Sequence, residues 1–155
     1  MAKKLALIAS KGSLDWAYPP FILASTAAAM GYEVHIFFTF YGLTLLKKDI
    51  SDLKVSPLGN PAMPMPIPMP NLAQMLPGME SMATMMMKQK IAKKGVASIE
   101  ELREACLESG VKLIACQMTV DLFDFKPTDF IDAIKFGGAA SFFEFAGESD
   151  ISLFM

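Results

Sequence analysis

The chain alternates between short apolar runs with the length of buried strands and longer segments with the pattern of helices. Five such runs lie at residues 4–10, 32–39, 111–116, 135–138 and 151–155. Strands that alternate with helices form parallel sheets whose two faces are covered. The order therefore predicts a three-layer α/β/α fold around a mainly parallel sheet of about five strands.

The first two runs define this fold most directly. A helical segment from about Leu14 to Met30 joins them, which makes residues 4–39 a βαβ unit with parallel strands. Pro19 and Pro20 interrupt the segment, and proline inside a helix removes a backbone hydrogen bond. We therefore expect the regular helix to begin near Tyr18.

Length, charge and residue counts exclude several classes of protein. The 155 residues fit one domain over residues 1–155, and a net charge of −2 argues against nucleic acid as a partner. Two cysteines and one histidine, His35, are too few for a disulfide framework or a Cys/His zinc site, so we expect no metal and no cofactor. The apolar run near the N-terminus is too short for a signal peptide, and we expect a cytoplasmic location.

A Met/Pro-rich insertion at about residues 55–90 departs from the alternation. Met and Pro alternate from Met63 to Pro70, which excludes a regular helix there, whereas residues 79–90 fit an amphipathic helix. Since 53% of the chain is apolar, we expect this segment to pack on a neighbouring subunit or to dock a partner. Residues 61–87 are also a candidate for peripheral membrane contact. Packing within the same subunit and Cu(I) binding through thioethers are the alternatives.

Cys116 ends the third apolar run and is the first candidate for chemistry. Ligands of open α/β sheets bind where parallel strands end and helices begin. A thiol at such a place lies near a helix N-terminus, which favours the thiolate, so we expect an accessible, ionisable Cys116. The second cysteine, Cys106, falls on the apolar stripe of a helix from Ser98 to Ser109, which predicts a structural role.

Four stretches of the sequence carry a family resemblance, namely residues 10–15, 37–43, 110–121 and 137–154. With them the chain resembles the DsrE/DsrF-like (DsrEFH-like) family of sulfur-relay proteins, in its larger, peroxiredoxin-like branch. The resemblance implies a flavodoxin-like domain and a sulfurtransferase-type carrier. In that role Cys116 takes up sulfane sulfur as a persulfide and passes it to a partner protein.

The same resemblance implies a homo-oligomer whose partners are small sulfur-carrier and rhodanese-like proteins. One departure lies at Asp124-Phe125-Lys126, where we expect a glycine.

The loops that follow the first three strands converge at one edge of a parallel sheet and supply the expected pocket. Lys11 is the nearest candidate cation for a thiolate, while Phe40, Tyr41 and Met118 would form an apolar wall around a persulfide. Thr119 would cap the helix after Cys116. The aromatic residues could instead only cover the sheet edge. The expected pocket comprises Lys11, Gly12, Thr39, Phe40, Tyr41, Met118 and Thr119.

Two other functions compete with the sulfur carrier. A peroxidase-like thiol redox protein would need Cys106 as the resolving thiol for Cys116, although Arg103 is the only arginine available for peroxidase surroundings. A non-catalytic oligomeric or membrane-proximal adaptor would use the Met/Pro-rich segment and leave Cys116 without a role. A nucleotide site is unsupported, because Lys11-Gly12 lacks the glycine spacing of phosphate-binding loops.

Overall fold

The computed structural model describes residues 1–56 and 76–155, so the Met-Pro alternation lies outside the described residues. In chain order the elements are β1 (Lys4–Ala9), α1 (Leu14–Ala29), β2 (Glu33–Phe38), the 3₁₀ helix η1 (Phe40–Leu46), α2 (Met79–Lys93), α3 (Ile99–Glu108), β3 (Lys112–Cys116), α4 (Gln117–Leu122), the 3₁₀ helix η3 (Pro127–Asp129), β4 (Lys135–Gly137), α5 (Ala139–Ala146) and β5 (Ile151–Phe154).

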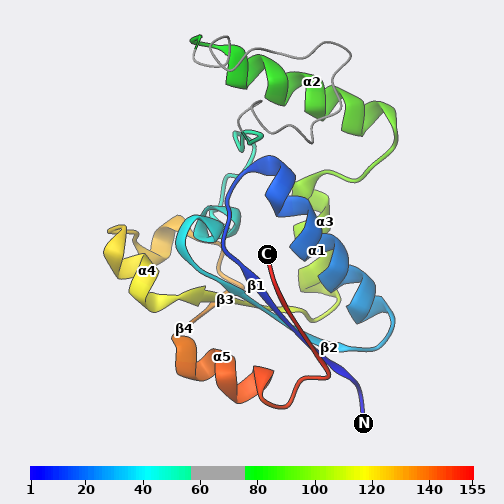
Figure 1. Cartoon of the computed structure of the whole chain (residues 1–155), viewed down its shortest axis with the longest axis vertical. Coiled ribbons are helices and arrows are strands. Elements are labelled where there is room, and N and C mark those ends of the chain that lie inside the picture. The colour runs from blue at the N-terminus through cyan, green and yellow to red at the C-terminus, as the bar shows by residue number, and fades with distance from the viewer. Residues whose placement is uncertain (57–75) are drawn as a thin grey trace.

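The strands form one sheet in the order β4-β3-β2-β1-β5, and every pair is parallel. The chain moves outward from β1 through β2 and β3 to β4, and then returns to the other side of β1 with β5. Right-handed connections place the helices of an outward path and of a return path on opposite faces of the sheet. Figure 1 shows this arrangement, with α1 and α3 on one face and α5 on the other. The predicted three-layer α/β/α fold is confirmed.

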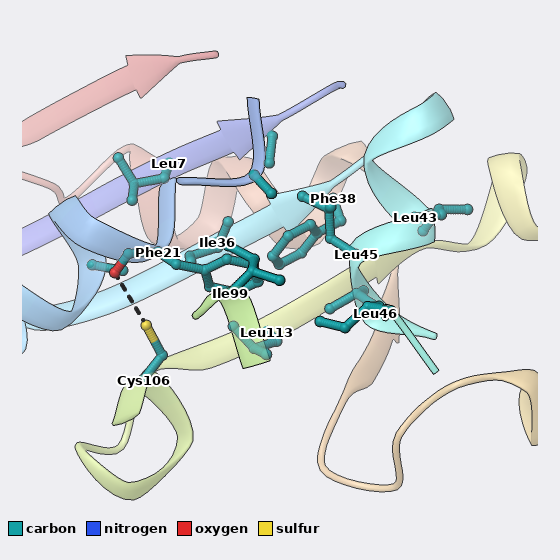
Figure 2. Packing of buried hydrophobic residues seen from close by; sticks show 14 of the residues in the cluster. Leu7, Phe21, Ile36, Phe38, Leu43, Leu45, Leu46, Ile99, Cys106 and Leu113 are labelled. Carbon is teal, nitrogen blue, oxygen red and sulfur yellow. Dashed lines mark hydrogen bonds between the residues drawn. The ribbon is translucent and has the colours of Figure 1, made fainter. Parts of the chain in front are cut away.

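The main core lies between the sheet and helices α1 and α3 (Figure 2). Alternate strand residues point into it, among them Leu7, Ile36 and Leu113, and all three are almost fully buried. Phe21 of α1 and Cys106 of α3 complete it from the helix side. Successive side chains of a strand point to opposite faces of the sheet, so every second residue enters this core and the others face α5.

The opposite face carries a second, smaller cluster. Phe37 of β2 and the β3 residues Ile114 and Cys116 form it, and Phe142 of α5 packs against them. One face of the sheet is therefore covered by two long helices, and the other by the single short helix α5.

The structure corrects the expected start of helix α1. Helix α1 begins at Leu14 rather than near Tyr18, because neighbouring residues hold its first turn: Leu14 N–H donates to Lys54 O, and Asp15 accepts from Ser56 N–H at 2.7 Å. The helix then continues through Pro19 and Pro20 to Ala29.

Lys126-Pro127-Thr128 in the sequence predicts the start of a helix that runs to about Ile134. Only the short η3 forms there, because Phe130 turns into the core and Ile131 N–H donates to Leu46 O. Asp124, where a glycine was expected, adopts a φ of 54°. That left-handed backbone is one that aspartate tolerates better than most side chains.

Helix α2 confirms the helix expected over residues 79–90. Its buried residues are Ala83 and Thr84, and Thr84 Oγ1 accepts from Val55 N–H at 3.0 Å. The apolar face of the expected amphipathic helix would include Met82 and Met86 together with Ala83, but both methionines are exposed. No helix within residues 1–56 and 76–155 combines the length and the apolarity needed to cross a membrane.

Candidate functional site

Cys116 is the last residue of β3 and lies where the chain changes from one face of the sheet to the other. After β3 the chain enters α4, whose Val120 packs into the main core, whereas after β4 it enters α5 on the opposite face. In open α/β sheets the crevice at such a switch point is the usual ligand site. Cys116 also pairs with Gly137 of β4, so the thiol stands beside a residue without a side chain.

The thiol itself is covered. Cys116 is 5% exposed and packs with Phe37, Ile114 and the half-buried Phe142. The expectation of an open thiol is therefore wrong for this conformation of the single chain. Its physical reason is the alternation along β3, which points Cys116 toward α5 rather than toward the loops at the strand ends.

Thr119 joins two elements instead of capping one. The N-cap position of α4 is held by Cys116, and Thr119 lies buried within the helix. Its Oγ1 is 3.2 Å from Oγ1 of Thr39 and accepts from Phe40 N–H at 3.3 Å. Thr119 thus connects the loop after β2 to the helix after Cys116, and Phe40 is held there with a φ of 49°, an uncommon backbone for a bulky residue.

Lys11 and Gly12 lie in a separate cavity of about 500 Å³. The Lys11 ammonium stands 3.7 Å from the centre of the Trp16 ring, which is a cation–π contact. The residues that line this cavity are Lys11, Gly12, Ser13, Trp16, Tyr41, Thr44 and Ser56. Among the described residues that line it, Cys116 does not occur, so the structure does not bring Lys11 to the thiol.

The residues expected to form an apolar wall do not belong to the cluster that encloses Cys116. Phe40, Tyr41 and Met118 are all exposed, with Tyr41 at 66%. Tyr41 stacks on Phe123 at 5.9 Å, and Phe40 meets the edge of the same ring at 6.1 Å. These side chains form an apolar surface at the carboxyl edge of the sheet, with α4 beneath it.

Cys106 belongs to the other face of the sheet. It is fully buried in the main core, where its thiol donates to Phe21 O at 3.4 Å (Figure 2). Burial raises the pKa of this thiol to about 12, so it stays protonated at neutral pH. The predicted structural role is supported. The sheet separates Cys106 from Cys116, so in this structure Cys106 is not placed to act as a resolving thiol for Cys116.

Sequence reasoning missed the residues that enclose Cys116. Phe37 and Ile114 share its face of the sheet, and the alternation of residues in adjacent parallel strands could have found them. Phe142 and Gly137 carry no comparable signal, because their position depends on the path of the chain back to β5.

These features define the class as an α/β protein with a parallel sheet and one thiol at a topological switch point. The chain belongs to the DsrE/DsrF/DrsH-like family, whose model matches residues 1–154, and the family predicted from the sequence is confirmed.

Two curated relatives and one solved structure resemble the chain along nearly its whole length. It is 69% identical to "Sulfur carrier protein DsrE2" of Allochromatium vinosum, over 99% of this chain and 98% of the relative. It is 31% identical to the uncharacterised protein YrkE of Bacillus subtilis, over 99% and 97%. The crystal structure of the E. coli protein ychN shares the fold with a TM-score of 0.56 at 10% identity, and the match covers 99% of each chain.

Proposed function

We propose that the protein is a sulfur carrier that takes up sulfane sulfur on Cys116 and delivers it to a partner protein. The observation that carries the proposal is the place of Cys116 at the switch point of the sheet. The name of the Allochromatium relative, a sulfur carrier, supports the same role. In this role the chain acts as a sulfurtransferase-type protein whose turnover depends on its partners.

The transfer is an exchange between two sulfur–sulfur bonds. The Cys116 thiolate attacks the outer sulfur of a donor's persulfide and a new S–S bond forms. The donor's S–S bond breaks, and its electron pair leaves with the donor as a thiolate. The outer sulfur keeps its proton, so atoms, charge and electrons balance without an added oxidant or reductant. Delivery to an acceptor is the same exchange, with the acceptor's thiolate as the attacking group.

Small sulfur-carrier and rhodanese-like proteins are the partners of this role. The apolar surface of Phe40, Tyr41, Met118 and Phe123 lies next to α4 and suits contact with such proteins. The cytoplasm is the proposed location, because the proposed role needs a reduced Cys116 and a reducing compartment keeps exchanging thiols in that state.

A homo-oligomer is part of the same proposal. It is supported by the edge strand β5, which exposes Ile151, Leu153 and Phe154 along an unpaired side of the sheet. Apolar edge strands are sites at which chains associate.

Sulfur loading tests the function directly. The reduced protein is incubated with polysulfide, or with thiosulfate and a rhodanese, and its intact mass is measured. Wild type and Cys106→Ser should gain sulfur, and Cys116→Ser should gain none. Equal loading of all three proteins, or consumption of peroxide without any sulfur adduct, would contradict the proposal.

A further inference from the structure

We propose that helix α5 is a movable cover over Cys116, and that Phe142 is the side chain that must leave before sulfur can be transferred. This inference rests on the proposed function, because only a thiol that exchanges sulfur with another protein has to be exposed. Exchange needs two sulfur atoms in bonding contact, and a cysteine residue that is only 5% exposed does not offer that contact. Some part of the pocket therefore moves during each transfer.

Two of the three walls around Cys116 are fixed. Phe37 and Ile114 belong to neighbouring strands in the middle of the sheet, and they are paired with each other in its register. Moving the backbone of either residue away would break the ladder of hydrogen bonds between β2 and β3. The third wall is Phe142, whose ring lies 5.5 Å from that of Phe37 and comes from outside the sheet.

Helix α5 has the features of an element that opens locally, with Phe145 stacked on His35 of β2 as its second contact with the sheet. It has eight residues, none of them buried, and its N-cap residue Gly138 provides no side-chain hydrogen bond. Short helices with little buried surface open at low free energy while the rest of the protein stays folded. Glycines adjoin both ends, with Gly137 and Gly138 before the helix and Gly147 after it.

The start of α5 is fitted to the strand that borders the thiol. A side chain on Gly137 would come within 3.2 Å of Ser141 and 3.3 Å of Ile114. The missing side chain thus lets the first turn of α5 lie close against β4, directly beside Cys116. The cover can close tightly there, and the two consecutive glycines supply the backbone freedom for it to open.

The two cysteines and two adjacent phenylalanines of this chain make a matched test. Wild type, Phe142→Ala and Phe143→Ala are treated with iodoacetamide, and labelling of each cysteine is followed by peptide mass spectrometry. Phe143 is on the same helix and 68% exposed. Its ring meets the edge of Phe142 at 5.6 Å but does not pack on Cys116, so its removal leaves Phe142 over the thiol. Phe142→Ala should label Cys116 roughly tenfold faster than wild type, whereas Phe143→Ala should stay within about twofold.

Cys106 monitors global unfolding in the same samples, because it lies in the main core. Its labelling should remain slow in every protein. Unchanged labelling of Cys116 in Phe142→Ala would overturn the inference, and so would equal acceleration of both cysteines. If the alanine variant does not fold, Phe142→Leu keeps most of the side-chain volume and should still accelerate Cys116 by about threefold.

Hydrogen exchange of the wild type gives a second test that needs no variant. Amides of α5 should exchange faster than those of α1, and equal protection of the two helices would contradict a movable cover. Neither measurement involves sulfane sulfur. A failure of the cover is therefore distinguishable from a failure of sulfur loading on Cys116.

Discussion

At the scale of single residues, a glycine lets the segment after β2 lie against the backbone at the end of β1. A side chain on Gly42 would overlap the backbone carbonyl of Ala9, the last residue of β1. Gly12 is equally close to the backbone of Tyr41. The loops after β1 and β2 therefore pack backbone to backbone, and this fixes the edge of the sheet next to the site.

Gly42→Ala should lower the free energy of unfolding by about 2 kcal/mol or more, because the neighbouring backbone cannot move aside. Urea denaturation measures the loss. Gly138→Ala is the matched control, since nothing lies within 4 Å of its added carbon, and it should cost less than about 1 kcal/mol. Equal losses in the two variants would show that the close approach is absent in solution.

Cys106 makes stability depend on alkaline pH. Its folded-state pKa of about 12 lies above the ordinary thiol value of 9.0, so the unfolded chain loses this proton first as the pH rises. Stability from this group is complete below pH 9 and is lost between pH 9 and about 12. Over this range wild type should lose about 1 kcal/mol per pH unit more than Cys106→Ala, measured by urea denaturation at each pH. Parallel curves for the two proteins would refute the assignment.

At the scale of elements, local signals were predictable and packing was not. Ser98 followed three residues later by Glu101 is the sequence pattern of a capping box, and the structure forms both of its hydrogen bonds. The start of α1 and the end of η3 were not predictable, because contacts with residues far along the chain decide them. The same holds for the site: a thiol at the end of β3 follows from strand order, whereas its cover by Phe142 depends on where α5 packs.

Helix α5 is joined to the sheet through His35. The imidazole stacks on Phe145 at 3.5 Å and finds no hydrogen-bond partner among the described residues, with Glu33 too distant at 3.5 Å for a strong one. Burial is the main cause that lowers the pKa of His35; the nearby Lys112 and Lys135 add to the decrease, and Glu33 opposes it.

Acid should therefore weaken the protein through His35. The unfolded chain binds a proton near the ordinary histidine value of 6.5 while the folded protein resists it, so stability falls as the pH drops below 6.5. His35→Leu should flatten this part of the curve, as measured by thermal unfolding between pH 7 and pH 5. A histidine variant with the same acid dependence as wild type would show that other groups are responsible.

At the scale of the whole molecule, the strand order decides which surfaces remain free. Because β5 returns to the far side of β1, one edge of the sheet is a short strand whose side chains are all exposed. Leu153 and Phe154 lie there, and Phe154 is 73% exposed. The apolar excess of the sequence predicted contact with another subunit or with a membrane, whereas the edge at which copies of the chain would meet depends on the topology.

Leu153→Lys tests whether this edge joins copies of the chain. A charge on an edge strand opposes pairing with a second strand, so the variant should sediment as a smaller species than wild type. Lys112→Leu, on the interior strand β3, serves as a control that leaves the edge unchanged. Sedimentation of wild type as a monomer, or of the Leu153 variant as the same oligomer as wild type, would contradict the proposed assembly.

The position of the two sulfur atoms on opposite faces of the sheet has a consequence for storage. In many thiol proteins a neighbouring cysteine displaces a bound sulfur and releases it as hydrogen sulfide. Here Cys106 is separated from Cys116 by the sheet and is protonated at neutral pH, so it cannot attack a persulfide on Cys116 in this structure. A persulfide on Cys116 would therefore last until a second protein accepts the sulfur, and its lifetime would depend on the rate at which the two proteins meet.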